Sequence, residues 1–179
     1  MNRIRVVGNS GSGKTTFSAE FAAILKIPHI ELDALHHQPN WEKPETGKFL
    51  SDVEQATKSD RWIVDGNYST ASEILWRKAD TLIFLDLPLR LALYRSTRRS
   101  LTRIFTKEIL WNGNRETWSA LFSFNREKNL LLWTLTNYKE RRKLYLSSEL
   151  LEFNPNLKVI HLTSTTEVAN FLETIRKDL

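Results

Sequence analysis

The feature that most constrains this chain is the segment Gly8–Thr15, which reads Gly-Asn-Ser-Gly-Ser-Gly-Lys-Thr. Two glycines separated by four residues and followed by lysine and a hydroxyl residue form a phosphate-binding loop, or P-loop, when they join a strand to a helix. Ile4–Val7 is a short β-branched run, and Thr15–Leu25 has apolar residues at helical spacing. Both flanks therefore fit, and the sequence predicts a nucleoside triphosphate site.

Residue types within the P-loop suit particular tasks. Glycines let the backbone turn tightly and bring its N–H groups, together with the helix N-terminus, close to phosphate oxygens. Lys14 is expected to reach the β- and γ-phosphates, and the Thr15 hydroxyl to ligate Mg²⁺. ATP and Mg²⁺ are the predicted cofactors, with ATP against GTP left open. The predicted nucleotide-binding residues are Gly8, Asn9, Ser10, Gly11, Ser12, Gly13, Lys14, Thr15 and Thr16.

The rest of the chain alternates between strand and helix patterns. Helices are predicted at Lys48–Lys58 and Thr166–Lys177. Strands alternating with helices indicate a parallel sheet covered on both faces. We therefore predict an α/β chain with the three-layer α/β/α P-loop NTPase fold, a five-stranded parallel sheet and a single domain over residues 1–179. After Ile4–Val7, the expected strands are His29–Leu32, Trp62–Val64, Thr81–Leu85 and Val159–Leu162.

Three of these strands are followed by aspartate. In open α/β sheets, ligands bind outside the carboxyl ends of the strands, so each is a candidate site residue. Asp65 occupies the place of a carboxylate that holds Mg²⁺, and Asp33 ends the second strand. Asp86 ranks last, because Leu87-Pro88 turns the chain away at once. The alternative for each is an ordinary turn or cap residue.

About seventy residues without a strand pattern separate the last two strands, more than one crossover helix needs. Helical patterns at Leu89–Thr106 and Asn129–Leu146 flank turn chemistry at Trp111–Arg115. We therefore expect a helical lid inserted roughly over residues 95–146. Residues 90–143 hold thirteen basic and four acidic side chains, and the whole excess of the +5 net charge lies there. Such a field attracts a nucleotide, a phosphorylated substrate or nucleic acid.

The chain resembles the adenylate-kinase-like branch of P-loop kinases through the P-loop, the third strand with Asp65-Gly66, and Ile83–Pro88 followed by Arg95 and Arg99. It is more closely similar to a family of bacterial proteins named DNA topology modulation proteins. That similarity spans most of the chain. Its landmarks are Gly8–Thr15, Glu31–His36, Arg61–Tyr68 and Leu110–Glu116.

The resemblance implies roles for the lid arginines. Arg95 and Arg99 fall where related kinases contact the nucleotide, and their i, i+4 spacing puts them on one helix face. A solvated basic face is the alternative. Arg115 either reaches the transferring phosphoryl group as a mobile lid arginine or forms a surface ion pair with Glu116. Arg141 and Arg142 fall where related kinases carry further phosphate contacts, but solvated surface arginines are the favoured interpretation.

The chain departs from adenylate kinases at the acceptor side. Asn67-Tyr68 replaces the proline and the arginine that would grip an acceptor phosphate, and Arg61 is the one arginine between Asp33 and Trp62. In small-molecule kinases of this architecture, a carboxylate after the second strand takes the proton of an acceptor hydroxyl, which needs hydrogen-bond reach. The sequence thus mildly favours a hydroxyl acceptor. His36 and His37 suit polar contacts there better than a metal site, since no third ligand is spaced with them.

The leading prediction is an enzyme, a P-loop kinase that transfers the γ-phosphoryl group of ATP to an unidentified small molecule. One alternative is an ATP-dependent nucleic-acid-binding regulator, for which the basic segment carries interleaved aromatic residues. No recognised nucleic-acid-binding motif accompanies them. A slow NTPase or a nucleotide sensor is a third interpretation. The aromatic residues in question are Trp111, Trp118, Phe122, Phe124 and Trp133.

Composition limits the remaining options. The absence of cysteine excludes disulfides and thiolate metal sites, and it fits a reducing cytoplasm. The N-terminus lacks a signal-peptide pattern, and the longest apolar runs are far too short for a membrane span. We therefore expect a cytoplasmic protein that does not enter membranes, with its oligomeric state open.

Overall fold

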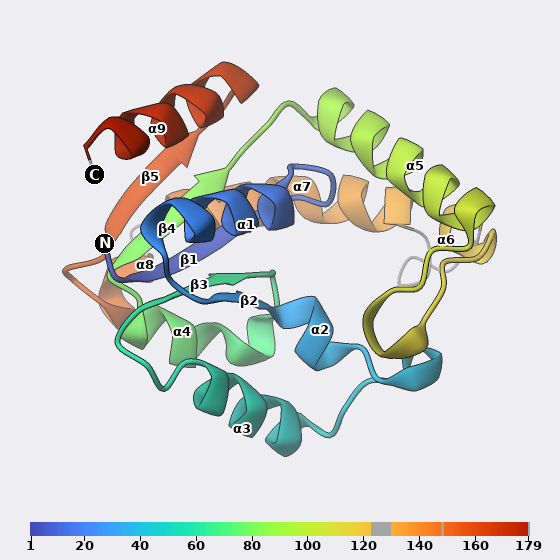
Figure 1. Ribbon diagram of the computed structural model, residues 1–179, viewed down its shortest axis with the longest axis horizontal. Coiled ribbons are helices and arrows are strands. Elements are labelled where there is room, and N and C mark those ends of the chain that lie inside the picture. The colour runs from blue at the N-terminus through green and yellow to red at the C-terminus, as the bar shows by residue number, and fades with distance from the viewer. Residues whose placement is uncertain (123–129, 148, 179) are drawn as a thin grey trace.

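A computed structural model describes residues 1–122, 130–147 and 149–178. Five parallel strands form one sheet in the order β2-β3-β1-β4-β5 (Figure 1). The predicted α/β class, five-stranded parallel sheet and P-loop NTPase fold are confirmed. The strands are β1 (Arg3–Gly8), β2 (His29–Glu31), β3 (Trp62–Asp65), β4 (Thr81–Leu85) and β5 (Lys158–Leu162).

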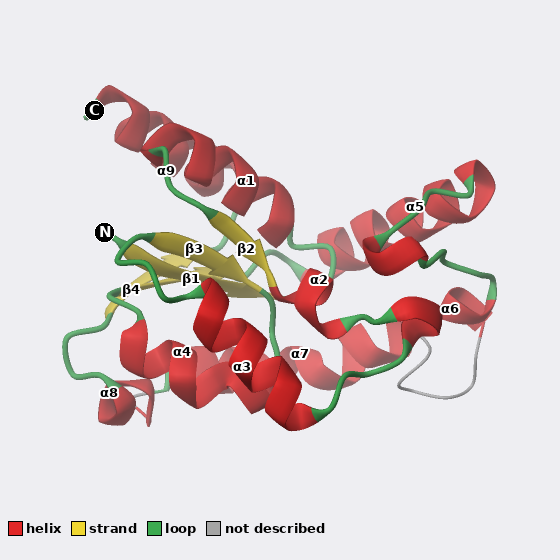
Figure 2. Ribbon diagram, turned by 60° about the horizontal axis from the view of Figure 1, so that its bottom comes forward, coloured by secondary structure: helices red, strands yellow, loops and turns green. Residues whose placement is uncertain are grey.

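Helices cover both faces of the sheet. Figure 2 shows the sheet between α1 and α9 on one side and α3, α4 and α8 on the other. The long helices α5 and α7, which pack against each other, lie between β4 and β5 in the chain. The helices are α1 (Lys14–Leu25), α2 (Leu32–His36), α3 (Thr46–Ala56), α4 (Ser72–Lys78), α5 (Leu89–Thr106), α6 (Ser119–Phe122), α7 (Leu130–Leu146), α8 (Glu149–Phe153) and α9 (Thr165–Lys177).

Alternation along the central strands divides the core in two. Ile83 and Leu85 of β4 pack with the cluster that includes Phe21 of α1. Leu82 and Phe84 of the same strand pack with the opposite cluster, which includes Trp76 of α4. Because successive side chains of a strand point to opposite faces, a strand covered by helices on both sides is buried at every position. That is why Thr81–Leu85 is buried throughout.

The predicted boundaries hold within two residues for the main elements, with one difference that matters. The second strand ends at Glu31, so Asp33 does not end a strand but lies in the first turn of α2. Leu32, which begins that helix, is fully buried. The next residue, Asp33, accepts a hydrogen bond from Tyr68, which follows the neighbouring strand β3.

Gly66 explains why α2 can lie so close to β3. It has φ +126°, which L side chains rarely adopt. A Cβ built there would lie 2.8 Å from the Cβ of Leu32. The Asp65-Gly66 pair therefore combines a carboxylate with the backbone shape that α2 packing requires.

None of the helices in the described part of the chain combines the length and the apolar character that crossing a membrane requires.

Candidate functional site

The P-loop connects the central strand β1 to α1. Gly13 forms the N-cap of α1 in the left-handed region and makes no side-chain cap bond, which leaves the first N–H groups of the helix facing the loop. Gly11 has φ +77°, and a Cβ on it would lie 2.0 Å from the carbonyl oxygen of Ala92. The loop is thus held against α5, in a contact that only glycine permits.

Lys14 folds back over the loop. Its Nζ donates to the backbone carbonyl of Asn9 at 3.0 Å. Burial lowers the pKa of Lys14 to about 8, and the nearby carboxylates of Asp33 and Asp65 act in the opposite direction. An ammonium group close to two carboxylates and poised on the P-loop is placed to meet phosphate oxygens.

Asp65 is a buried carboxylate with spare capacity. Its Oδ2 lies 3.4 Å from Nε2 of His29 on the neighbouring strand. Among the described residues, no donor makes a well-formed hydrogen bond to that oxygen. Leaving a buried polar atom unpaired costs free energy, so an orphaned oxygen at the carboxyl edge of a sheet suits a cation or its bound water. Thr15, at the start of α1, is partly exposed.

Asn67, noted in the sequence only as a departure from adenylate kinases, holds the start of the P-loop. Its side-chain amide donates to the carbonyl oxygen of Gly8, and its Oδ1 accepts from the Gly8 N–H at 3.4 Å. The hydroxyl of Tyr145 on α7 donates to the same Oδ1 at 3.3 Å. One side chain therefore ties together β3, the P-loop and the helical segment after β4.

Tyr68 was likewise missed. Its hydroxyl donates to Oδ1 of Asp33 at 2.6 Å and lies 3.3 Å from Nε2 of His37. Burial, with Asp33 as a second cause, raises the pKa of Tyr68 far above its ordinary value, so the phenol remains a donor. Burial lowers the pKa of His37, which favours its neutral form.

A buried cation is linked to the backbone of Tyr68 by hydrogen bonds through Ser72. Arg5 of β1 is fully buried and lies 3.6 Å above the ring centre of Trp76. It donates to the hydroxyl of Ser72 at 3.0 Å, which donates in turn to the backbone carbonyl of Tyr68 at 3.0 Å. Burial lowers the pKa of Arg5 to about 10, so the guanidinium stays charged at neutral pH.

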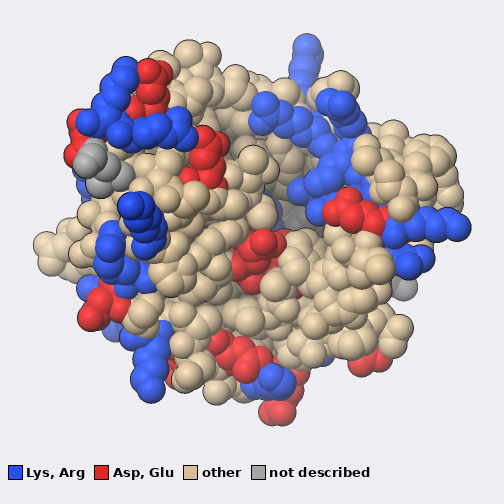
Figure 3. All heavy atoms as spheres, viewed as in Figure 1, with Lys and Arg blue, Asp and Glu red and all other residues tan. Residues whose placement is uncertain are grey.

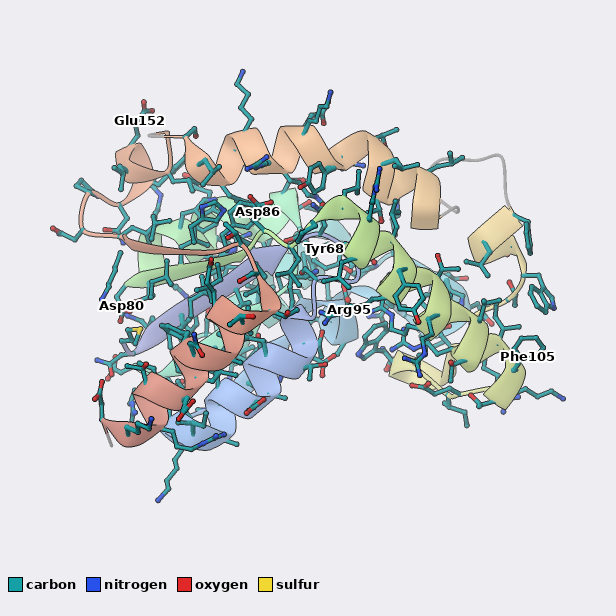
Figure 4. All side chains as sticks on the ribbon, turned by 90° about the horizontal axis from the view of Figure 1, so that it is seen from above. Tyr68, Asp80, Asp86, Arg95, Phe105 and Glu152 are labelled. Carbon is teal, nitrogen blue, oxygen red and sulfur yellow. The ribbon has the colours of Figure 1, made fainter. Side chains whose placement is uncertain are left out.

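Two predicted lid arginines come together with the P-loop. Arg99 donates to the hydroxyl of Ser10 at 3.3 Å, and that hydroxyl lies 3.2 Å from the hydroxyl of Ser96. Nη1 of Arg95 lies 4.0 Å from the position of a Cβ on Gly13, and Figure 4 shows Arg95 and Tyr68 in the same central region. Figure 3 shows basic side chains gathered beside a hollow in this face. Both arginines can therefore turn toward an anion on the loop.

Arg115 is placed differently. It is exposed, and Glu116, its proposed ion-pair partner, bonds instead to Arg103 at 2.9 Å. The structure does not bring the side chain of Arg115 together with the P-loop arginines; its backbone carbonyl accepts from the indole of Trp41 at 3.0 Å. The role of Arg115 in transfer stays a prediction.

The two late arginines do not behave alike, and neither is simply solvated. Arg141 is half-buried, and burial lowers its pKa while Tyr145, Asp33 and Tyr68 favour its charged form. It therefore lies within electrostatic range of Asp33 and Tyr68, unlike a fully solvated surface arginine, and its contact with phosphate stays a prediction. Arg142 bonds to Oδ2 of the buried Asp86 at 2.9 Å, an oxygen that also lies 2.9 Å from His161. Asp86 thus has a structural pairing, in keeping with its low rank.

The aromatic residues weighed for nucleic-acid binding separate into groups. Trp118 stacks on Phe122 and meets Phe105 edge-on, all three being exposed. Trp111 lies instead against Glu31 and His37. Phe124 lies outside the described residues, as does the side chain of Trp133. This arrangement offers an exposed apolar surface but no recognised nucleic-acid-binding element.

Comparisons with known proteins agree with the fold. No family model matches the chain, and no curated protein matches its sequence. The chain is similar in structure to a shikimate kinase from Acinetobacter baumannii in complex with shikimate, with a TM-score of 0.55, 13% identity, and 98% of this chain and 90% of that chain covered. A shikimate kinase from Aquifex aeolicus vf5 gives 0.54 with 16% identity and 98% and 97% covered.

A gluconokinase from Sinorhizobium meliloti 1021 gives a TM-score of 0.52 with 16% identity, and 99% of this chain and 94% of that chain are covered. The fold is that of P-loop kinases. At these identities the likeness concerns the fold, and function has to be argued from the site. The resemblance to DNA topology modulation proteins stays an expectation from the sequence.

Proposed function

We propose that this protein is an ATP-dependent kinase that transfers the γ-phosphoryl group to a hydroxyl of a small molecule. The observation that carries the proposal is the position of Asp33 close to Lys14. A carboxylate there, held by Tyr68 through one oxygen, leaves the other oxygen for an acceptor hydroxyl. The structural neighbours include shikimate kinases and a gluconokinase, which are named for hydroxylated acids, and this supports an acceptor of the hydroxyl class.

The donor side of the reaction uses the P-loop. Backbone N–H groups of Gly8–Thr16 would bind the phosphates, and Lys14 would bridge β- and γ-oxygens. Arg95 and Arg99 would balance the negative charge that spreads over the moving phosphoryl group, while Arg141 approaches from the acceptor side. Arg115 would join them only if its segment moved. Together these groups stabilise charge that water would otherwise solvate.

The residues present fit Mg²⁺. Thr15 and Asp65 are the protein oxygens at the start of α1 and the end of β3, and Oδ2 of Asp65 is without a donor. Mg²⁺ usually takes one or two protein oxygens and completes its shell with phosphates and water, so a larger acidic cluster is unnecessary. When bound, the ion would neutralise charge on the β- and γ-phosphates.

Phosphoryl transfer forms one bond and breaks another. The acceptor oxygen forms a bond to the γ-phosphorus as the bond to the β–γ bridging oxygen breaks, and ADP leaves. Oδ2 of Asp33 takes the proton of the acceptor hydroxyl, because Oδ1 already accepts from Tyr68. A phosphate acceptor would arrive as an anion and would not need this proton transfer.

The deciding experiment is a metabolite screen for acceptor-dependent ADP release, run on the wild-type protein, Lys14→Ala and Asp33→Asn. We expect a hydroxyl compound to stimulate turnover, and each variant to lose at least about 100-fold in kcat. Asp33→Asn should retain ATP binding, measured by calorimetry. Stimulation by duplex DNA with no active metabolite would contradict the proposal and favour a nucleic-acid-dependent function, whose affinity should then fall steeply with salt.

A further inference from the structure

The segment Trp111–Glu116, which the proposed reaction leaves largely unused, docks on the acceptor side of the site. It forms a short 3-10 turn, with Asn112 at φ 56°. Four side-chain hydrogen bonds join it to residues 37–41. The donors and acceptors are Asn112 Nδ2 to the His37 carbonyl (2.6 Å), Asn114 Nδ2 to the Gln38 carbonyl (2.8 Å), Trp41 N–H to Asn114 Oδ1 (2.9 Å) and Trp41 Nε1 to the Arg115 carbonyl (3.0 Å).

This docking is well built for an irregular segment. Asn114 is buried and uses both ends of its amide across the contact. Trp111 reaches further and donates its indole N–H to Oε2 of Glu31, the last residue of β2, at 3.1 Å. Buried amides with satisfied donors and acceptors specify a single arrangement of the chains that carry them. The contact therefore fixes the loop that follows Asp33.

His37 lies at the centre of the docked contact. Its ring stacks on Trp111 with centroids 5.7 Å apart and meets Trp41 edge-on at 5.0 Å. His36 meets it edge-on from a third direction at 5.3 Å. With its carbonyl bonded to Asn112, the residue has little freedom to rotate. Its Nε2 is held 3.3 Å from the hydroxyl of Tyr68.

The single hydroxyl proton of Tyr68 determines the direction of the hydrogen bonds among His37, Tyr68 and Asp33. Tyr68 has one hydroxyl proton, and it donates that proton to Oδ1 of Asp33 at 2.6 Å. Its oxygen can then only accept a proton from His37, which must carry hydrogen on Nε2. The hydrogen bonds therefore run from His37 to Tyr68 to Asp33. Each donor fixes the orientation of the next group.

We propose that Trp111, His37 and Tyr68 are positioning residues for Asp33, so that docking of the Trp111–Glu116 segment aligns the carboxylate that takes the acceptor proton. This inference rests on the proposed function. It assigns the segment a task on the acceptor side, whereas Arg95 and Arg99 serve the phosphates. When the segment undocks, His37 is released and Oδ1 of Asp33 loses its fixed orientation.

Nuclear magnetic resonance of the histidine side-chain nitrogens tests the chain of bonds without any acceptor. We expect His37 to carry its proton on Nε2, with slow solvent exchange. Tyr68→Phe removes the acceptor and Trp111→Ala removes the stack, so both should speed that exchange at least about tenfold. Trp118→Ala changes an exposed tryptophan just after the Trp111–Glu116 segment and should leave the exchange rate unchanged. A proton on Nδ1 alone, or exchange insensitive to both variants, would overturn the inference.

Kinetics test the consequence for the base, with Mg²⁺-ATP as substrate and water as the probe acceptor. Tyr68→Phe, His37→Leu and Trp111→Ala should each lower kcat about tenfold while the KM for ATP stays within about twofold. His37→Gln restores a donor near Nε2 and should recover most of the rate. Trp118→Ala is again the matched control.

The outcomes separate the two proposals. Failure of the wild-type protein to bind ATP counts against the proposed kinase and therefore against the inference that rests on it. Binding and hydrolysis that persist unchanged in Tyr68→Phe, His37→Leu and Trp111→Ala overturn the inference alone. A parallel loss of ATP affinity and rate, with no rescue by His37→Gln, would show a merely structural role and would also overturn it. If ATP binds without measurable hydrolysis, the exchange rates at His37 decide.

Discussion

The P-loop takes its geometry from eight consecutive residues, whereas the surroundings of Asp33 come from segments spread over much of the chain. On the phosphate side, backbone N–H groups and glycines do most of the shaping. On the acceptor side, Tyr68, His37 and Trp111 meet through side-chain contacts across long sequence separations. A binding surface made of backbone tolerates exchange of many side chains. A surface made of interlocked side chains can change its ligand by changing one of them.

The largest effect should follow disruption of the backbone-built side. Gly11→Ala places a methyl group 2.0 Å from the Ala92 carbonyl in a conformation that alanine rarely adopts. If the displaced loop loses about 2 kcal/mol of binding free energy, the affinity for ATP falls about 30-fold, which calorimetry would measure. The control is Gly113→Ala, also at positive φ but with no atom within 4 Å of the new methyl. Equal losses in both variants would mean that backbone strain, not the contact with α5, matters.

The next effect is a pH dependence of the phosphate side. Burial lowers the pKa of Lys14 to about 8, so the free protein loses the ammonium charge as pH rises through that value. If only the charged form binds ATP, affinity should fall about tenfold per pH unit above 8, and binding should take up a proton there. Calorimetry in two buffers of different ionisation enthalpy measures that uptake. Lys14→Arg, which stays protonated, should remove the dependence, and an unchanged profile would refute this assignment.

A smaller effect is expected where the two sides join. Asn67→Ala removes both bonds to Gly8 and the partner of Tyr145, which should weaken ATP binding about 5- to 10-fold. Asn170→Ala, an exposed asparagine on α9, is the matched control. If Asn67→Ala impaired only turnover and left ATP affinity intact, Asn67 would belong to the acceptor side and not to the boundary between the two sides.

The smallest effect on activity should come from the Arg142–Asp86 pair, which lies outside both the phosphate side and the acceptor side. Arg142 is half-exposed, so removing its bond to Asp86 in Arg142→Ala should cost about 1 kcal/mol of stability or less. Thermal unfolding should shift by a few degrees, with ATP turnover unchanged. A large loss of turnover with normal stability would place Arg142 in the phosphate site after all.

Sequence reasoning succeeded where the information is local. The P-loop residues adjoin one another, and the strands are short apolar runs bounded by turn residues, so the P-loop and the main elements could be predicted within two residues. Asp65 lies at the end of β3 as predicted, at the edge where the ends of parallel strands meet, and its role toward Mg²⁺ stays a proposal. No sequence pattern identified Tyr68, because its contact with Asp33 exists only once α2 has brought Asp33 beside it.

The arginines show the same limit from another direction. Spacing alone placed Arg95 and Arg99 on one helix face, and both lie at the P-loop. Spacing says nothing of Arg141 against Arg142, which are adjacent in sequence yet face different neighbours. Their assignment depends on how α7 is rotated against the sheet, and the weak amphipathic pattern of that helix does not define its rotation. The partner of Glu116 was missed for a similar reason, because Arg103 reaches it from the preceding helix.

The contact between Gly66 and Leu32 has a mechanical consequence. Each residue adjoins one of the two carboxylates, Asp65 and Asp33, and a Cβ added to Gly66 would lie 2.8 Å from the Cβ of Leu32. Close-packed atoms transmit displacement rather than absorb it. A side chain introduced at Gly66 would therefore push α2 away from β3 and change the spacing between the two carboxylates.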